Sequence, residues 1–188
     1  MKGKVIILCA PSGSGKTTLA KFLINMEKFN LKFSVSATTR KKRISEKNNI
    51  DYHFISPIIF KNKIKDNEFI EFEKVYDGVF YGTLKSEVES LINNYNIIFD
   101  VDVAGAESLK KYFSGKSISI FIKPPSIDEL NNRLEKRGLN TKNDLEERLK
   151  KAKKEMLMSE AFDYTIVNDN LEIAKKKIYD LVENFLSN

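Results

Sequence analysis

A glycine-rich turn near the N-terminus carries the residues of this chain that most directly suggest chemistry. It ends in Gly15-Lys16-Thr17-Thr18, follows the apolar run 5–10, and leads into a segment whose apolar residues recur at helical spacing. Glycines let backbone N–H groups approach an anion closely, and the start of a helix adds partial positive charge. A lysine and a threonine hydroxyl beside such a turn suit the phosphates and the Mg²⁺ ion of a nucleoside triphosphate.

We therefore predict a phosphate-binding loop here, rather than a glycine- and serine-rich turn between an unrelated strand and helix. Lys16 would reach the β- and γ-phosphates, and Thr17 would hold the metal ion. Ala10 stands where the motif has its first glycine, and alanine is the mildest replacement. The expected triphosphate-binding residues of the loop are Ala10, Pro11, Ser12, Gly13, Ser14, Gly15, Lys16, Thr17 and Thr18.

The arginines form a second chemical signal, because only five of the 32 basic residues are arginine. Arginine grips phosphate or carboxylate with a planar fork, which lysine lacks. The five fall into two clusters, Arg40 with Arg43, and Arg133 with Arg137 and Arg148. We interpret the clusters as two phosphate-handling regions beyond the loop; the alternative is that these arginines are structural.

Length and composition indicate one folded domain, with 188 residues, 41% hydrophobic residues and a net charge of +6. A basic protein can bind nucleic acid, a membrane or phosphorylated small molecules. The apolar run behind Lys2 and Lys4 is too short for a signal peptide and leads directly into the glycine-rich turn. No segment approaches transmembrane length, so we expect no membrane partner.

The cysteine and histidine content excludes two kinds of site. Cys9 is the only cysteine, which rules out a disulfide within one chain and favours a reducing, cytoplasmic location. Cys9 lies in an apolar run, so we expect a small buried hydrophobe rather than a nucleophile. One cysteine and one histidine, His53, cannot build a metal cluster, and we expect His53 at the surface or in a groove.

The elements that must position these residues alternate between strand and helix. This alternation favours an α/β fold with a parallel sheet and helices on both faces. The expected core strands are 4–9, 32–36, 96–101, 117–122 and 163–167. The expected helices are 15–27, 84–94, 104–113, 126–137, 142–160 and 170–186.

Two segments interrupt this rhythm, and each carries one arginine cluster. Residues 34–84 are rich in Tyr and Phe and indicate short strands around one helix, whereas residues 126–158 indicate charged helices. Ser126 is a predicted N-cap, and Glu129 completes a capping box. Insertions of this kind suggest lids that close and exclude water. The predicted core consists of residues 1–33, 85–125 and 159–188.

A series of motifs follows the loop in order along the chain. They are Ser34-Val35-Ser36-Ala37-Thr38-Thr39-Arg40-Lys41-Lys42-Arg43, Asp51-Tyr52-His53-Phe54, Glu68-Phe69-Ile70-Glu71, Phe80-Tyr81-Gly82-Thr83, Asp100-Val101-Asp102-Val103-Ala104-Gly105-Ala106, Pro124-Pro125-Ser126, Arg133-Leu134-Glu135-Lys136-Arg137-Gly138 and Val167-Asn168-Asp169. Together with the loop they resemble the guanylate kinase family over essentially the whole chain. The resemblance implies a P-loop three-layer α/β fold with a central parallel sheet, a small mixed α/β GMP-binding insertion at 34–84 and a helical lid at 126–158. It implies phosphorylation of GMP, and of dGMP, by ATP with Mg²⁺.

The resemblance also implies how GMP is held. Arg40, Arg43, Tyr52 and Tyr81 would hold its phosphate, Glu71 would read guanine with Ser36 and Thr83 beside it, and Asp100 would lie near the base and ribose. A buried carboxylate accepts hydrogen bonds from guanine N1–H and the amino group, whereas adenine would leave it without donors. The alternatives are ordinary packing for the tyrosines and a surface strand carboxylate for Glu71.

The remaining site residues serve ATP, the metal ion and the transfer itself. The residues expected to act in catalysis are Lys16, Arg40, Arg133, Arg137 and Arg148. The family resemblance places Asn168 and Asp169 at the adenine end of ATP. Asp100 and Asp102 end an apolar strand and therefore face the ligand crevice of a parallel sheet. We assign Thr17 and Asp102 to Mg²⁺, with Asp102 acting through water.

The chain departs from the family pattern at several turns. Ala104 stands in place of a glutamine, Lys42 and Ser45 replace proline and glycine, and one additional residue lies around Asp77-Gly78. None of these changes removes a phosphate-binding group, but they leave the loop geometry open.

Three other functions remain as alternatives. A guanylate-kinase-like module that binds proteins would typically lose Lys16 and the lid arginines, which are present here. A small-molecule kinase with another acceptor would not need Ser36, Glu71 and Thr83 together. A nucleic-acid-binding protein would show an aromatic-basic motif or a recognition helix, and the chain has neither. We therefore expect ATP and GMP as partners, no nucleic acid, and a monomer or homodimer.

Overall fold

The computed structural model describes residues 2–74, 78–136 and 142–188. Arg137 and Asp77, which the sequence analysis singled out, lie outside these ranges. Within the described residues, no helix is long and apolar enough to cross a membrane.

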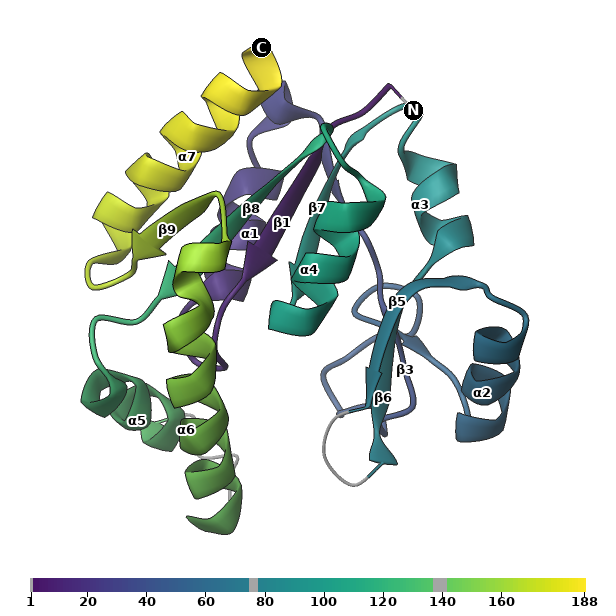
Figure 1. The fold of residues 1–188 in the computed structure, drawn as a ribbon, viewed down its shortest axis with the longest axis horizontal. Coiled ribbons are helices and arrows are strands. Elements are labelled where there is room, and N and C mark those ends of the chain that lie inside the picture. Colours follow the sequence, from purple (N-terminus) through teal and green to yellow (C-terminus); the bar gives the residue numbers. More distant parts are fainter. Residues whose placement is uncertain (1, 75–77, 137–141) are drawn as a thin grey trace.

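A five-stranded parallel sheet forms the centre of the molecule (Figure 1). Its strand order is β2 (Leu31–Phe33), β7 (Asn96–Val101), β1 (Val5–Cys9), β8 (Ser117–Lys123) and β9 (Tyr164–Val167). Every residue of β1 is fully buried, because neighbouring strands flank it and helices cover both faces. This explains why its sequence is a continuous apolar run rather than an alternating one.

Helices pack on both faces of this sheet and separate the core into two layers. On one face, α1 (Lys16–Ile24) and α7 (Leu171–Ser187) cover Ile6 and Leu8. On the other face, α3 (Lys85–Leu91) and α4 (Val103–Tyr112) cover Ile7 and Cys9. Cys9 is fully buried in the core, as predicted, and this burial raises the pKa of its thiol to about 12. Short 3₁₀ turns lie at Glu27–Phe29 and Met158–Ala161.

A second, smaller sheet lies within the segment 34–84. Its order is β4 (His53–Phe54), β3 (Ala37–Thr38), β6 (Phe80–Leu84) and β5 (Phe69–Lys74), with antiparallel pairs except between β3 and β4. One helix, α2 (Pro57–Lys65), buries Phe60 against Phe69 of this sheet. These elements match the prediction of short strands around one helix.

Two helices form the other projecting segment, opposite the second sheet in Figure 1. They are α5 (Ile127–Lys136) and α6 (Lys142–Leu157), and Leu130, Leu134 and Ala152 pack between them. The Ser126 hydroxyl accepts a 3.0 Å hydrogen bond from the Glu129 backbone N–H, which is the predicted N-cap. The Glu129 carboxylate bonds the Nε of Arg133 at 2.8 Å, one turn along the helix.

The predicted α/β fold with a central parallel sheet is confirmed. The expected strand 32–36 is the least accurate, since β2 ends at Phe33 and the chain then turns toward the second sheet. The helix observed in the region expected to be helical at 84–94 is also shorter than predicted, because α3 ends at Leu91. The division into a core with two closing insertions stays a prediction.

Candidate active site

The glycine-rich turn lies between β1 and α1, where the carboxyl end of the sheet meets a helix N-terminus. Gly13 and Gly15 have φ angles of 96° and 91°, which only glycine adopts readily. A Cβ at Gly15 would also lie 2.3 Å from the side-chain amide nitrogen of Asn168. That amide donates a 2.8 Å hydrogen bond to the carbonyl of Ser14, so Asn168 braces the turn from the end of β9.

Lys16 and Thr17 both bond the carboxylate of Asp100. Asp100 Oδ1 lies 2.6 Å from Lys16 Nζ, and its Oδ2 accepts a 2.9 Å hydrogen bond from the Thr17 hydroxyl. Lys16 Nζ also donates to the carbonyl of Val101 at 2.6 Å. Burial lowers the pKa of Lys16, but Asp100 together with the neighbouring Cys9 and Asp102 outweighs this effect, so the net pKa lies above its ordinary value.

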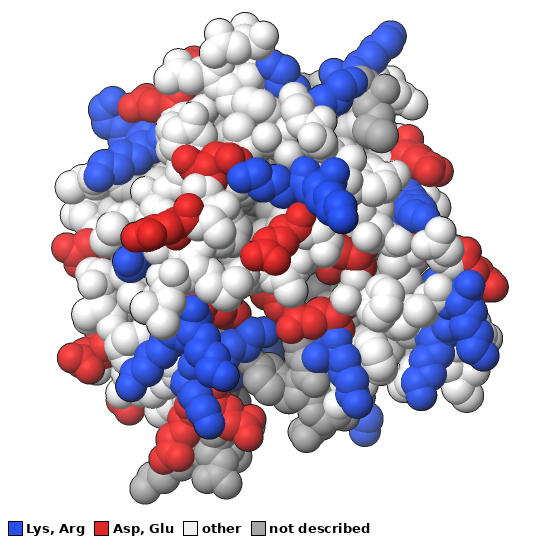
Figure 2. All heavy atoms as spheres, viewed as in Figure 1, with Lys and Arg blue, Asp and Glu red and all other residues white. Residues whose placement is uncertain are grey.

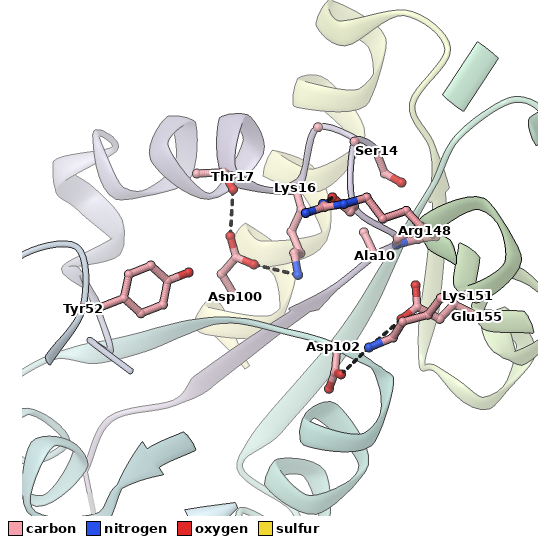
Figure 3. Close-up of a pocket in the computed structure, with 14 residues that line it drawn as sticks. Ala10, Ser14, Lys16, Thr17, Tyr52, Asp100, Asp102, Arg148, Lys151 and Glu155 are labelled. Carbon is pink, nitrogen blue, oxygen red and sulfur yellow. Dashed lines mark hydrogen bonds and ion pairs between the residues drawn. The ribbon is translucent and has the colours of Figure 1, made fainter. Parts of the chain in front are cut away.

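A cavity of about 260 Å³ opens over the turn (Figure 3). Its lining includes all of residues 10–17, and Arg148 of α6 reaches across it to donate a 2.9 Å hydrogen bond to the Ser12 hydroxyl. The structure thus brings loop residues, Lys16 and one predicted lid arginine around one space. Thr18 lies in the first turn of α1, outside this lining among the described residues. The lining residues beyond the turn are Tyr52, Asp100, Asp102, Arg148, Lys151 and Glu155.

Asp102 differs from Asp100 in the partners of its carboxylate. It caps the N-terminus of α4 by accepting a 3.0 Å hydrogen bond from the Gly105 backbone, and it bonds Lys151 Nζ at 3.2 Å. Asp100 is the carboxylate that bonds Thr17, the residue predicted to hold the metal ion. The geometry therefore favours Asp100 over Asp102 as the carboxylate that could share a metal ion with Thr17.

A second cavity, of about 210 Å³, continues from the first toward the second sheet. Both cavities are lined by Lys16, Tyr52, Asp100, Asp102 and Lys151. The second is also lined by Ser36, Glu71, Glu73, Tyr81, Gly82 and Val101. Figure 2 shows a hollow between the α5–α6 lobe and the second sheet, with acidic and basic side chains at its rim. The two cavities therefore form one cleft with two ends.

Glu71 lies in the second cavity, on β5 beside β6. Its Oε1 accepts a 2.6 Å hydrogen bond from the hydroxyl of Thr83, which is fully buried. A Cβ on Gly105 would lie 3.1 Å from Glu71 Oε2, so the glycine lets the start of α4 approach this carboxylate. Burial raises the pKa of Glu71 to about 6 despite the Thr83 hydrogen bond. Glu71 is thus a half-buried acceptor that faces the cavity, and not an exposed surface strand carboxylate.

Arg40 and Tyr52, two of the predicted phosphate-binding groups of segment 34–84, lie beside a third, Tyr81. Arg40 Nε donates a 3.0 Å hydrogen bond to the Tyr81 hydroxyl, and the Tyr52 ring lies 5.7 Å from the Tyr81 ring. Burial raises the pKa of Tyr52, which lines both cavities. Arg43 contributes its backbone N–H to Glu46 at 2.8 Å, while its side chain is 58% exposed.

Glu46 is a residue of this cluster that the sequence analysis missed. Its carboxylate bonds both terminal nitrogens of Arg40, and this pairing lowers the pKa of Glu46 to about 2. A glutamate three residues after Arg43 in a polar run was the available signal. His53 is half-buried, with its Nδ1 2.9 Å from Asn49 Oδ1 and its Nε2 3.3 Å from Glu87 Oε2.

Other predicted residues lie beside the cleft. Arg133 Nη1 donates to the backbone carbonyl of Asn168 at 3.1 Å, which links α5 to the end of β9. Among the described residues, Arg133, Asn168 and the exposed Asp169 lie outside both cavity linings. Arg137 lies outside the described ranges.

Comparison with known proteins agrees with this arrangement. The family model described as "Guanylate kinase" matches residues 2–185. A guanylate kinase of Porphyromonas gingivalis is 45% identical over 185 residues, covering 98% of this chain and 98% of that protein. One of Bacteroides fragilis is 47% identical over 186 residues, covering 98% and 91%. The crystal structure of guanylate kinase from Anaplasma phagocytophilum matches with a TM-score of 0.77 and 32% identity, covering 97% and 85%. These matches, together with the order of the motifs and the cleft with two ends, show that the chain belongs to the guanylate kinase family.

Proposed function

We propose that this chain is a nucleoside monophosphate kinase that transfers the γ-phosphoryl group of ATP to GMP, and to dGMP, in purine nucleotide metabolism. The observation that carries this proposal is the two-ended cleft. One end is the glycine-rich turn with Lys16, and the other contains the half-buried acceptor Glu71. A donor and an acceptor nucleotide bound at the two ends would meet over Lys16 and Asp100, which line both cavities.

The turn would bind the phosphates of ATP. Its backbone N–H groups and the N-terminus of α1 favour anions, and Lys16 and Arg148 add two positive charges beside the same space. We place the adenine near Asn168 and Asp169, at the end of β9. In this arrangement Asn168 has a second role, because it already supports the turn through the Ser14 carbonyl.

The second cavity would bind GMP. Glu71 would accept hydrogen bonds from guanine N1–H and the amino group, with Thr83 and Ser36 beside the base. AMP lacks that pair of donors, and a buried carboxylate left without donors is costly. Arg40, Arg43, Tyr52 and Tyr81 would hold the acceptor phosphate, and Asp100 would lie toward the ribose.

Thr17 and Asp100 would hold Mg²⁺. Their hydroxyl and carboxylate oxygens lie 2.9 Å apart beside the loop, and hard oxygen donors of this kind suit that ion. Asp102, assigned from the sequence to act on the metal through water, would keep that indirect role, because its carboxylate bonds Lys151. When bound, Mg²⁺ supplies positive charge that stabilises the phosphates during transfer.

The chain itself would contribute positioning and charge neutralisation. Lys16 and the lid arginines Arg133, Arg137 and Arg148 would stabilise charge on the transferred group without exchanging protons. The acceptor phosphate oxygen would attack the γ-phosphorus directly while the bond from that phosphorus to the β–γ bridging oxygen breaks and ADP leaves, so no covalent enzyme intermediate forms. Closure of residues 34–84 and 126–158 over the core would exclude water.

We place this activity in the cytoplasm, because Cys9 is the only cysteine and is buried as a free thiol. A monomer or a homodimer is compatible with a cleft built from one chain. The protein-binding alternative is not favoured, since Lys16 and Arg148 both line the first cavity.

ADP release from ATP and Mg²⁺ tests the proposal, with GMP, dGMP, AMP, UMP and CMP as separate acceptors. Turnover with GMP and dGMP alone would support it. Lys16→Met is the matched inactive control, because it keeps side-chain bulk and removes the charge. Equal turnover with AMP, or a stable phosphoenzyme, would contradict the proposal.

A further inference from the structure

Lys151, on α6, lies where the two ends of the cleft meet. It is one of the residues that line both cavities, and Figure 3 shows its side chain beside Asp102 and Glu155. The neighbouring lysines of the same helix, Lys150, Lys153 and Lys154, are exposed. Lys151 therefore differs from its neighbours on α6, because its side chain turns into the cleft while theirs face solvent.

The ammonium group of Lys151 faces three carboxylates from different parts of the molecule. Its Nζ lies 3.2 Å from Asp102 Oδ2, 3.6 Å from Glu73 Oε1 and 3.7 Å from Glu155 Oε1. Glu73 belongs to β5 of the second sheet, and Asp102 caps α4 of the core. One side chain thus joins the helical lobe both to the core and to the second sheet.

Lys151 offsets the negative charge of the carboxylates that gather where the two cavities meet. Burial raises the pKa of Glu155, although Lys151 opposes the effect. Asp100 and Glu71 add two more acidic side chains to the same cleft. Without Lys151, the carboxylates around the junction would repel one another and any phosphate brought between them.

We propose that Lys151 is a positioning residue that draws α6 toward β5 through Glu73 and so brings the helical lobe over the acceptor nucleotide. This inference rests on the proposed kinase activity and extends it to a residue that no motif of the sequence singled out. Lys151 acts through Glu73 and Asp102, in contrast to Arg148, which reaches the loop.

Steady-state kinetics of Lys151→Gln provide the first test. We expect kcat to fall about five- to tenfold, with smaller changes in the KM for ATP, because closure is impaired more than nucleotide binding. Lys151→Arg should restore most of the activity. Lys153→Gln is the matched control, since residue 153 is exposed and lies about 200° around the helix from residue 151.

A double-mutant cycle with Glu73→Gln identifies the partner. If the pair acts as a unit, the double variant should be no worse than Lys151→Gln alone. Equal kcat and KM values for Lys151→Gln and Lys153→Gln would overturn the proposal, as would fully additive losses with Glu73→Gln.

Urea unfolding of the same variants without nucleotide makes the test independent of activity. Coupling between Lys151 and Glu73 should change the folding equilibrium constant about two- to fivefold beyond additivity. An additive result would overturn the ion pair itself. If the variants show this coupling but the wild-type protein forms no GDP, the proposed function is contradicted instead.

Discussion

The guanidinium of Arg40 and the carboxylate of Glu46 face each other through two parallel hydrogen bonds, 2.9 Å from Nη1 and 2.8 Å from Nη2. Nη1 also donates to the Lys41 carbonyl, and Nε donates to the Tyr81 hydroxyl. Most of the Arg40 donors are therefore engaged within the protein, which orients the guanidinium plane before any phosphate arrives.

Glu46→Gln should loosen this orientation. The amide keeps the size of the side chain but loses one acceptor oxygen and the charge, so we expect the KM for GMP to rise about tenfold. The KM for ATP should hardly change, because Arg40 lies outside the loop. Steady-state kinetics with each nucleotide varied in turn measure both values. Glu68→Gln is the control, since Glu68 forms a more exposed pair with Lys63 in the same segment; an equal effect of both changes would count against an orienting role.

Glu71→Gln should impair the use of GMP by about a hundredfold or more in kcat/KM, because the amide presents a donor where guanine also has donors. ATP binding, measured by calorimetry, should be retained, which separates loss of base recognition from misfolding. Unchanged turnover of GMP would rule out Glu71 as the residue that reads the base.

The titration of Glu71 predicts how the stability of the protein depends on pH, which can be tested without measuring enzyme activity. Its pKa is raised from 4.5 to about 6 in the folded chain, so between these values the folded state binds more protons than the unfolded state. Stability therefore falls as pH rises through this window, by roughly 2 kcal/mol in total from this group.

Urea unfolding at several pH values checks the sign. Glu71→Gln removes the titrating group and should stabilise the protein at pH 7 relative to wild type, with a smaller difference at pH 4.5. GMP binding should weaken as pH falls below about 6, because the protonated carboxyl loses acceptor capacity. A variant less stable than wild type at pH 7 would contradict the proposed cost of burying this charge.

Arg148→Ala should lower kcat by at least about a hundredfold, because a cation that reaches the loop can stabilise charge on the transferred group. Binding of ATP should change less than kcat. Lys154→Ala removes an exposed charge from the same helix and serves as the control. Single-turnover measurements would separate the transfer step from product release, and a defect confined to release would contradict this role.

Asp100→Asn and Asp102→Asn distinguish the two candidate metal carboxylates. We expect Asp100→Asn to raise the Mg²⁺ concentration needed for half-maximal activity about tenfold, because Asp100 bonds Thr17. Asp102→Asn should act more weakly on Mg²⁺, since its carboxylate bonds Lys151 and caps α4. The reverse order would restore the assignment made from the sequence.

The central sheet was predictable because its buried parallel strands are continuous apolar runs, of which β1 is the clearest. The loop was predictable because glycine, lysine and threonine at this spacing have a direct physical use. Glu46 was not predictable in this way, since its partner lies across an irregular turn that follows no periodicity. The difference between Asp100 and Asp102 was also hidden, because Asp102 leaves β7 to cap α4 and strand alternation no longer applies.

The hydrogen bond from Asn168 to Ser14 joins residues separated by 154 positions in the chain. During synthesis, the glycine-rich turn leaves the ribosome long before Asn168 is made, so the nascent turn lacks its support. Nucleotide capture should therefore begin only after β9 has been made, and a stalled chain that ends before β9 should fail to bind ATP.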